Sequence, residues 1–326
     1  MKVLVYGCGV IGSYLVHVLC AAGNDVTVAA RGRWRDTLEQ KGLRIRHKLQ
    51  KRETVDYPKV IGEANPDEAY DLVFSVMQGQ QQKELLPTLA KADAPIFVLV
   101  GNNLEAEELE AEFAALSAKK RSLLFGFQGT AGLREEDRVT CVRFGNGSLN
   151  IGGLHREASP EEKTVLEQAF AGSPYRLKWT DDMYGWLYCH AAFILPIVYV
   201  SYACGCDLRK ATKQQIRDGV KATEEAYGLI AEAGIRIRPE GDEKMFRSRP
   251  KMLLLRGMMR LIAGTSIGEL AATDHCRNAV TEMEWLDRHF NRMHNRHPEY
   301  SMPVWNKLRC DMPSWVDIHR LYDRKK

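Results

Sequence analysis

Apolar positions in the first half of the chain form short runs, and these are separated by segments in which apolar residues recur with the period of a helix. Five runs are short and apolar enough for strands, at residues 2–6, 25–29, 71–76, 96–100 and 122–127. A charged amphipathic segment at 105–119 predicts a helix between the last two of them. Strands that alternate with helices indicate an α/β fold, a Rossmann-type doubly wound parallel sheet with helices on both faces.

Further segments extend this pattern to residue 179. The runs at 138–144 and 148–152 flank Gly145-Asn146-Gly147, and this predicts a hairpin appended to the sheet. Ser159 followed by Pro160 predicts a capped start for a helix that reaches about residue 171. A last strand is predicted at 175–179.

The strand pattern stops after residue 179, and the rest of the chain has helical periodicity. Helices are predicted at 181–203, 211–234, 240–264 and 275–296, with a helical tail after Pro303. We therefore expect a dinucleotide-binding domain at 1–179 and an all-helical C-terminal domain at 180–326. By fold-level analogy, the helical domain shapes the substrate pocket.

Two apolar segments of the second half have alternative interpretations. The stretch at 191–204 contains Pro196 and is shorter than a membrane span, which predicts a buried helix, kinked or restarted at the proline. The segment at 251–262 is interpreted as an internal helix. Its alternative is a subunit contact, so a homodimer stays open.

Composition and charge limit the classes of partner. A net charge of +4 is too small to argue for a nucleic-acid partner. A strand that begins at residue 2 leaves no room for a signal peptide, and the eight cysteines are expected to be reduced thiols in a cytoplasmic protein. No cysteine or histidine group has the spacing of a structural zinc site, so no metal is expected. No membrane association is expected either, because the longest apolar stretch is shorter than a membrane span.

The first apolar run ends in a Gly-x-Gly-x-x-Gly turn, and a helical pattern follows. In a dinucleotide-binding unit, the first glycine permits the tight turn, the second lets the backbone approach a pyrophosphate, and the third lets the helix pack on the strand. The N–H groups at the helix start then bind the phosphates. The alternative is a glycine turn without a ligand. The predicted cofactor contacts are Gly7, Cys8, Gly9, Val10, Ile11 and Gly12.

Arg31 at the end of the second run distinguishes between the two nicotinamide cofactors. An NAD(H) site usually has an acidic residue there, which accepts from the ribose hydroxyls, whereas a guanidinium suits the 2′-phosphate of NADP(H). We therefore predict NADP(H). The alternative is a solvated basic loop, since Arg33 and Arg35 follow closely.

Several motifs together resemble the ketopantoate reductase (2-dehydropantoate 2-reductase) family over nearly the whole chain. Beyond the glycine turn and Arg31, they are Lys41-Gly42-Leu43-Arg44-Ile45, Asp71-Leu72-Val73 with Val76, Gly101-Asn102-Asn103-Leu104 with Glu107-Glu108, Gly145-Asn146-Gly147 with Ile151-Gly152, and Asp274 with Thr281-Glu282-Met283-Glu284. The resemblance implies that Asn102 and Glu282 contact the cofactor, Glu282 as an acceptor for ribose hydroxyls. The alternative for Glu282 is a solvated helix residue. Gln78 stands where the family has a lysine near the nicotinamide.

The departures from the family lie on the predicted helix at 181–203. The family has a general-acid lysine there, with asparagines at i+4 and i+8 on the same helix face. Those positions fall on Leu187, Ala191 and Leu195 when Pro196 anchors the alignment, and on Tyr188, Ala192 and Pro196 when Trp186 anchors it. The family's serine before the aspartate falls near Leu270. A face of Leu187, Ala191 and Leu195 would leave the polar groups of ketopantoate unpaired, at about 1–3 kcal/mol each.

A replacement proton donor is needed if the chain is an enzyme. Tyr188 and His190 are the nearest candidates, because a tyrosine of lowered pKa or a protonated histidine can donate to an alkoxide. Each has a structural alternative as a buried residue. We predict an NADP(H)-dependent oxidoreductase that acts on a carbonyl or imine of a small molecule other than ketopantoate. The alternatives are an authentic 2-dehydropantoate 2-reductase and a non-catalytic protein that binds or senses NADP(H).

Overall fold

The computed structural model describes residues 1–63, 68–246, 249–265, 268 and 273–322. The chain forms two compact units, Met1–Met183 and Tyr184–Lys326, which are described separately below. The first is an α/β unit, and the described residues of the second form helices and connecting loops without a strand, so the predicted fold class is confirmed. The predicted domain boundary at 179/180 lies close to the division between the units.

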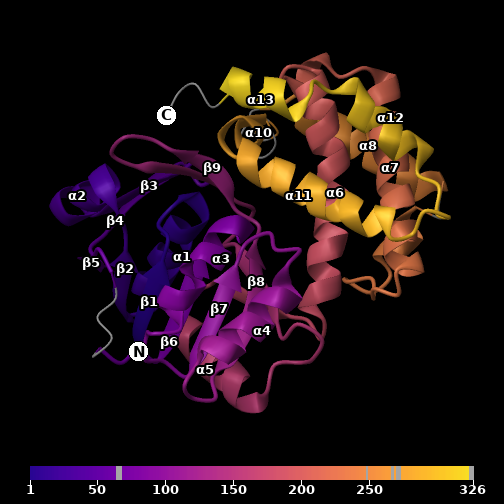
Figure 1. The fold of residues 1–326 in the computed structure, drawn as a ribbon. Helices are drawn as coiled ribbons and strands as arrows, with labels where there is room; N and C mark the ends of the chain where they lie inside the picture. Colours follow the sequence, from indigo (N-terminus) through magenta and orange to yellow (C-terminus); the bar gives the residue numbers. More distant parts are fainter. Residues whose placement is uncertain (64–67, 247–248, 266–267, 269–272, 323–326) are drawn as a thin grey trace. The chain divides into compact units, whose positions relative to one another are not determined.

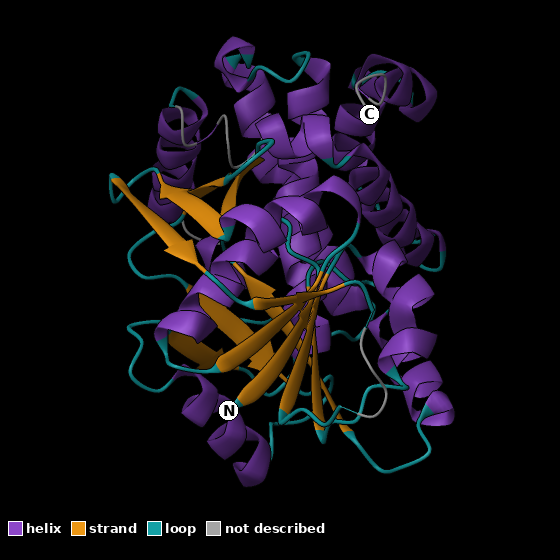
Figure 2. Ribbon diagram, turned by 90° about the vertical axis from the view of Figure 1, so that its left-hand side faces the viewer, coloured by secondary structure: helices purple, strands orange, loops and turns teal. Residues whose placement is uncertain are grey.

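The main sheet of the first unit has the strand order of a dinucleotide-binding fold (Figures 1 and 2). Its order is β12-β11-β8-β7-β6-β1-β2-β5. Neighbouring strands run parallel, except that β11 pairs with β8 antiparallel. The strands are β1 (Lys2–Tyr6), β2 (Asp25–Ala29), β5 (Lys59–Ile61), β6 (Leu72–Val76), β7 (Ile96–Val100), β8 (Ser122–Gln128), β11 (Ser148–Gly152) and β12 (Arg176–Trp179).

Helices cover both faces of this sheet, as predicted. They are α1 (Val10–Ala21), α2 (Gly32–Lys41), α3 (Gly79–Leu89), α4 (Ala106–Leu116) and α5 (Pro160–Phe170). Val98 of β7 belongs to the buried cluster of α1 and α5, whereas its neighbour Phe97 contacts Phe113 of α4 at a ring distance of 4.9 Å. Because successive strand residues point to opposite faces, α4 lies on the face opposite to α1. The start of α5 is fixed by the predicted cap, since Ser159 and Glu162 form a capping box.

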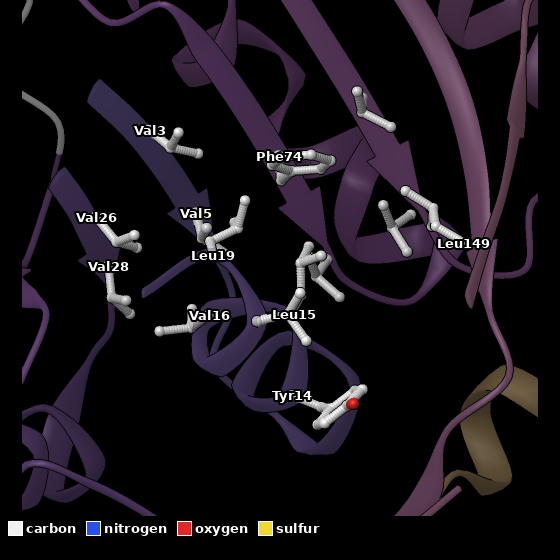
Figure 3. Packing of buried hydrophobic residues seen from close by; sticks show 14 of the residues in the cluster. Val3, Val5, Tyr14, Leu15, Val16, Leu19, Val26, Val28, Phe74 and Leu149 are labelled. Atoms are coloured by element: carbon white, nitrogen blue, oxygen red, sulfur yellow. The ribbon is translucent and has the colours of Figure 1, made fainter. Parts of the chain in front are cut away.

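Helix α1 packs on β1 and β2 through aliphatic side chains (Figure 3). Leu19 of the helix lies beside Val5 of β1 and Val16 points toward Val28 of β2, and all four side chains are fully buried. Burial of this kind contributes about 1.5–3 kcal/mol for each aliphatic side chain. It fixes the N-terminus of α1 at the carboxyl end of β1, where the glycine turn lies.

A second sheet covers the other side of α1, and it overturns the predicted hairpin at 138–152. Its order is β4-β3-β10-β9, with β3 (Leu43–His47), β4 (Arg52–Asp56), β9 (Ala131–Arg134) and β10 (Val139–Val142). β10 pairs with β3 and β9, whereas β11 pairs with β8 and β12 of the main sheet. Cys141 of β10 and Ile151 of β11 are both buried in the cluster around α1, but they reach it from two different sheets.

The secondary structure in the described part of the second unit is α-helix and short 3-10 helix, joined by loops. They are α6 (Met183–Ala203), η1 (Leu208–Lys210), α7 (Lys213–Glu232), η2 (Asp242–Met245), α8 (Arg249–Ala263), α10 (Asp274–Asn278), α11 (Val280–Asn295), α12 (Pro303–Asp311) and α13 (Trp315–Tyr322). The helix predicted at 275–296 is divided at Ala279, whose φ of −128° and ψ of 38° are not helical. Helix α8 buries Leu255 but leaves the apolar side chains of Leu253 and Leu254 exposed.

Helix α6 agrees with the predicted bounds of 181–203 to within two residues. Pro196 lies inside one continuous helix of 21 residues, so the helix does not restart at the proline. By length and composition alone this helix could cross a membrane, although 67% of its most apolar window is buried inside the structure. A buried core helix passes the same test, so the feature is weak support for a membrane span.

Candidate functional site

Gly7 occupies the point where the strand order of the main sheet reverses. It follows β1 with a φ of +91°, and its N–H donates to the carbonyl of Ala29 at the end of β2 over 3.3 Å. A Cβ atom at Gly7 would collide with the carbonyl oxygen of Val76 at the end of β6. In open α/β sheets, the crevice at such a reversal is where ligands bind.

The other two glycines of the turn have different surroundings. A Cβ atom on Gly12 would collide with the backbone carbonyl of Gly7, so this glycine permits the close packing of α1 on the turn. A Cβ atom on Gly9 would have nothing within 4 Å. The space beside Gly9 is therefore open, next to the first-turn residues Val10 and Ile11, whose N–H groups have no acceptor within the helix.

Cys8 and Gln128 support the turn from inside. Burial raises the pKa of the Cys8 thiol, which lies 3.3 Å from the Ser13 hydroxyl, so Cys8 packs rather than acts as a nucleophile. Gln128 donates to the carbonyl of Ile11 over 3.0 Å and accepts from the hydroxyl of Tyr175 over 2.6 Å. This buried chain of hydrogen bonds fixes the first turn of α1.

Arg31 is the N-cap residue of α2, and its side chain is exposed. Gly32 follows with a φ of +57°, and a Cβ atom there would also have nothing within 4 Å. Arg35 pairs with Glu39 over 2.8 Å, but among the described residues neither Arg31 nor Arg33 forms an ion pair. The start of α2 therefore carries unneutralised positive charge next to open space.

The loops after β6 and β7 carry the other predicted contacts of this unit. Gln78 is the half-buried N-cap of α3 and accepts from the Gln80 amide over 2.7 Å. Asn102 follows β7 and is 8% exposed. Because parallel strands end at one edge of a sheet, Gln78 and Asn102 lie at the same edge as the glycine turn and Arg31.

Gln82 is a buried residue of this region that the sequence did not indicate. Its side-chain amide donates to the carbonyls of Met77 and Val100 over 3.1 Å each, and its oxygen accepts from Asn103 over 3.0 Å. It thereby joins the loop after β6 to the loop after β7. The sequence offers little to single it out, since it is one of four glutamines in residues 78–82.

In the second unit, the predicted substrate face of α6 is buried. Leu187, Ala191 and Leu195 are 2%, 1% and 0% exposed. Tyr188 is 8% exposed, and its ring lies 4.9 Å from that of Tyr184. The residues of α6 that retain some exposure are Tyr184, Trp186, His190, Phe193, Ile194, Ile197 and Ala203.

His190, His275 and Glu282 lie in one neighbourhood of this unit. The His190 ring stacks on Trp186 at 5.2 Å, and burial together with the charge of His275 lowers the pKa of His190 to about 4. Glu282 is 5% exposed in the first turn of α11, and its carboxylate lies 3.5 Å from Nε2 of His275. The sequence did not indicate His275, because its contact with Glu282 joins two helices that were predicted as one continuous helix. Leu270 lies outside the described residues.

The structure thus brings the predicted site residues into two groups, one in each unit. The glycine turn, Arg31, Gln78 and Asn102 form the first, and Tyr188, His190 and Glu282 belong to the second. All eight cysteines are free thiols. Within the described part of the chain, no group of three or more histidine, cysteine and acidic side chains is placed to hold a metal ion.

The site residues of the first unit lie in a segment that matches a known protein family. A model of the family "Ketopantoate reductase PanE/ApbA" matches residues 3–156. A 2-dehydropantoate 2-reductase of Archaeoglobus fulgidus is 28% identical over 166 residues, which cover 51% of this chain and 52% of that protein. In this match the chain therefore spans about half the length of its curated relative.

Solved structures of similar fold cover the chain almost completely. A PanE/ApbA family ketopantoate reductase from Ralstonia eutropha JMP134 matches with a TM-score of 0.70 at 15% identity, over 99% of both chains. D-mandelate dehydrogenase in a ternary structure with NADH and anilino(oxo)acetate matches with a TM-score of 0.70 at 14% identity, over 100% of both chains. At these identities the likeness concerns the fold. Residues 3–156 therefore match the ketopantoate reductase PanE/ApbA family, and the likeness in fold to solved members of that family extends over the rest of the chain.

Proposed function

We propose that this chain is an NADP(H)-dependent oxidoreductase that transfers a hydride between the nicotinamide and a carbonyl or imine carbon of a small molecule other than ketopantoate. The observation that carries the proposal is the arrangement of residues at the carboxyl edge of the main sheet. There a glycine turn with open space beside Gly9 adjoins a helix start at which Arg31 is exposed and forms no ion pair with any described residue.

The residues at this edge fit a dinucleotide phosphate. The space beside Gly9 and Gly32 is open and leaves room for phosphate groups at the starts of α1 and α2. A side chain at either glycine would begin to fill this space. Arg31 would hold the 2′-phosphate through paired donors, and Gln78 and Asn102 would contact the remainder of the cofactor from their loops. Glu282 would accept hydrogen bonds from a ribose. The cofactor, when bound, supplies the hydride, and the chain supplies its position.

The substrate side supports a carbonyl compound that is less polar than ketopantoate. Leu187, Ala191 and Leu195 are buried, and the partly exposed part of α6 is mainly aromatic and apolar, with Tyr184 and His190 as its polar side chains. A neighbour in fold, D-mandelate dehydrogenase, is named for an aromatic hydroxy acid. We therefore propose a 2-oxo acid, ketone or imine with an apolar substituent.

His190 is the better of the two candidate proton donors. Tyr188 is packed among aromatic rings of the second unit, including Phe290 at 6.5 Å. His190 retains partial exposure, and with a pKa of about 4 its imidazole is neutral near pH 7. A neutral imidazole still donates one N–H and can polarise a carbonyl oxygen.

The reaction is tested by following NADPH consumption with a panel of 2-oxo acids, ketones and imines that includes ketopantoate. Turnover on an apolar carbonyl or imine, with none on ketopantoate, is the expected result. Preferred turnover of ketopantoate would instead establish an authentic 2-dehydropantoate 2-reductase. Tight NADPH binding without turnover on any class would favour a binding or sensing protein.

The cofactor is tested with Arg31→Ala and a matched variant, Arg35→Ala. Arg31→Ala should weaken NADPH binding at least tenfold and leave NADH binding nearly unchanged, because a charge-assisted phosphate contact contributes about 1.5–3 kcal/mol. Arg35→Ala removes an arginine that already pairs with Glu39, so it should change neither affinity more than about twofold. Equal losses of both cofactors in Arg31→Ala would refute the phosphate role.

A homodimer and a cytoplasmic location remain proposals. The exposed side chains of Leu253 and Leu254 on α8 support a subunit contact at that helix. Light scattering of the purified protein, compared with Leu254→Asp, would measure the subunit number and the contribution of this helix to it.

A further inference from the structure

Three segments that lie far apart in the sequence converge on Trp34. Trp34 lies in the first turn of α2 and is 9% exposed. Arg134, the last residue of β9, holds its guanidinium 5.5 Å from the centre of the Trp34 ring. Burial raises the pKa of the Cys8 thiol in the glycine turn, and Ser13, Trp34 and Arg134 lower it, so both Trp34 and Arg134 lie near that turn. The second sheet therefore reaches the predicted phosphate site.

The charge of Arg134 is not balanced by any described acidic side chain. Its side chain is exposed and forms no ion pair with another described residue. Arg138, just before β10, is different, because it lies within 4 Å of the carboxylates of Glu53, Glu135 and Asp137. Acidic partners are thus available to arginines of this sheet, and Arg134 has none.

Arg134 adds to charge that already surrounds the start of α2. Arg31 caps this helix and Arg33 lies in its first turn, and both are exposed without an ion pair to the described part of the chain. Three guanidinium groups around one helix start repel one another unless an anion lies between them. The helix dipole favours an anion at the same place. Open space beside Gly32 and Gly9 gives such an anion room.

Trp34 makes this arrangement more specific than a set of flexible surface arginines. A guanidinium over an indole face is attracted to the ring and loses part of its freedom. Its paired donors are then oriented before an anion binds, which suits the geometry of a phosphate.

We infer that Arg134, held by Trp34, forms with Arg31 and Arg33 a subsite for the phosphate monoester of the dinucleotide, and that it is a specificity-determining residue for NADP(H). The inference rests on the proposed function and extends it to a residue of the second sheet. Arg134 acts on the 2′-phosphate alone, so it contributes to the preference for one cofactor and not to the binding of the nicotinamide.

The experiment compares Arg134→Gln with Arg138→Gln in the full-length protein, by calorimetric titration with NADPH, NADH and the fragment 2′,5′-ADP. Arg134→Gln should weaken NADPH and 2′,5′-ADP at least tenfold and change NADH by less than twofold. The weakened NADPH binding should also depend less on salt. Arg138→Gln removes an arginine that already has acidic partners, so it should keep the wild-type ratio of NADPH to NADH affinity.

A further variant separates position from charge. Trp34→Leu keeps all three arginines but removes the aromatic face, and it should reduce the preference for NADPH by an intermediate factor. Thermal melts of each variant establish that it folds. An unchanged ratio in Arg134→Gln, or an equal loss of both cofactors, would overturn the inference while leaving the proposed function in place. A wild-type protein that binds NADPH no more tightly than NADH would overturn both the NADP(H) assignment and the role of Arg134.

Discussion

The Asn103 side-chain amide donates to the side-chain oxygen of Gln82 over 3.0 Å, and both side chains are buried. The side-chain amide of Gln82 donates to the carbonyl of Met77, just after β6, and to the carbonyl of Val100, the last residue of β7. The missing side chain of Gly101 permits the same approach, since a Cβ atom there would lie 2.5 Å from the Met77 carbonyl oxygen. The loops after β6 and β7 are therefore held as one body.

Replacing Gln82 with leucine should loosen these loops. The substitution leaves two carbonyls and the Asn103 amide without their partner, which we expect to cost about 1–3 kcal/mol of unfolding free energy for each buried group that water cannot reach. Because Gln78 and Asn102 lie in the same loops, NADPH affinity should fall about tenfold. Denaturant unfolding and titration with NADPH measure the two effects. Gln168→Leu, at an exposed position of α5, is the control and should change neither quantity.

Gly9→Ala and Gly12→Ala should separate ligand binding from folding. Gly9 has a φ of −77°, which alanine adopts readily, and its Cβ atom would meet nothing within 4 Å. The unfolding free energy of the Gly9→Ala variant should change by less than about 0.5 kcal/mol. Dinucleotide binding should be lost, because the methyl group occupies the space for the pyrophosphate. Gly12→Ala drives a methyl group into the Gly7 carbonyl and should cost about 1–3 kcal/mol of stability.

The control for this pair is Gly257→Ala on α8, where a Cβ atom also meets nothing within 4 Å. It should leave dinucleotide binding at the wild-type level. Full dinucleotide affinity in Gly9→Ala would argue against a phosphate beside this glycine and would weaken the proposed function directly.

The sequence predicted the elements whose stability is local or whose burial is complete. The bounds of β1, β2 and β7 were predicted to the residue, because central parallel strands are buried on both faces and read as unbroken apolar runs. The start of α5 was predicted because the cap and its acceptor lie within four residues.

The elements that were missed depend on contacts between distant segments. The second sheet pairs β3 with β10, across more than 90 residues, and a glycine turn between β10 and β11 gave the local signal of a hairpin that does not form. The same applies to the site. Arg31 follows from the spacing of one motif, whereas the contacts of Gln82, Arg134 and His275 join segments that no local pattern connects.

In the second unit, Asp287 is a buried carboxylate whose loss should be costly. It is 1% exposed and accepts from Nε and Nη2 of Arg309 over 2.8 and 2.9 Å. The Tyr199 hydroxyl and the Trp315 indole N–H also donate to it, over 2.7 and 3.0 Å. Asp287→Ala leaves these donors without an acceptor, and we expect a loss of about 3–5 kcal/mol in unfolding free energy.

A double-mutant cycle with Arg309→Met tests whether this loss belongs to the pair. Arg309→Met alone leaves the carboxylate buried with fewer donors, so it should also destabilise the protein. The double variant should lose less than the sum of the two single variants, with a coupling of about 0.5–3 kcal/mol. Strict additivity in urea unfolding would show that Asp287 and Arg309 act independently.

His47 should make the first unit less stable in mild acid. Its side chain is fully buried, and burial, His17, Arg143 and Arg52 together lower its pKa from 6.5 to about 4. Between those two values the unfolded chain binds a proton that the folded chain does not. Stability therefore rises with pH through this window, and the contribution of His47 is complete above pH 6.5 and lost as the pH falls toward 4.

The expected size of this effect is about 3 kcal/mol between pH 7 and pH 4. It is measured by hydrogen exchange of the β3 and β10 amides at pH 7, 6 and 5, in the wild type and in His47→Gln. The variant loses the imidazole contact to Thr54 at 2.9 Å and should be less stable at pH 7. Its stability should then fall less between pH 7 and pH 5, because glutamine takes up no proton. Parallel pH profiles for the two proteins would mean that His47 carries no proton linkage, and the acid sensitivity of the unit would have to arise elsewhere.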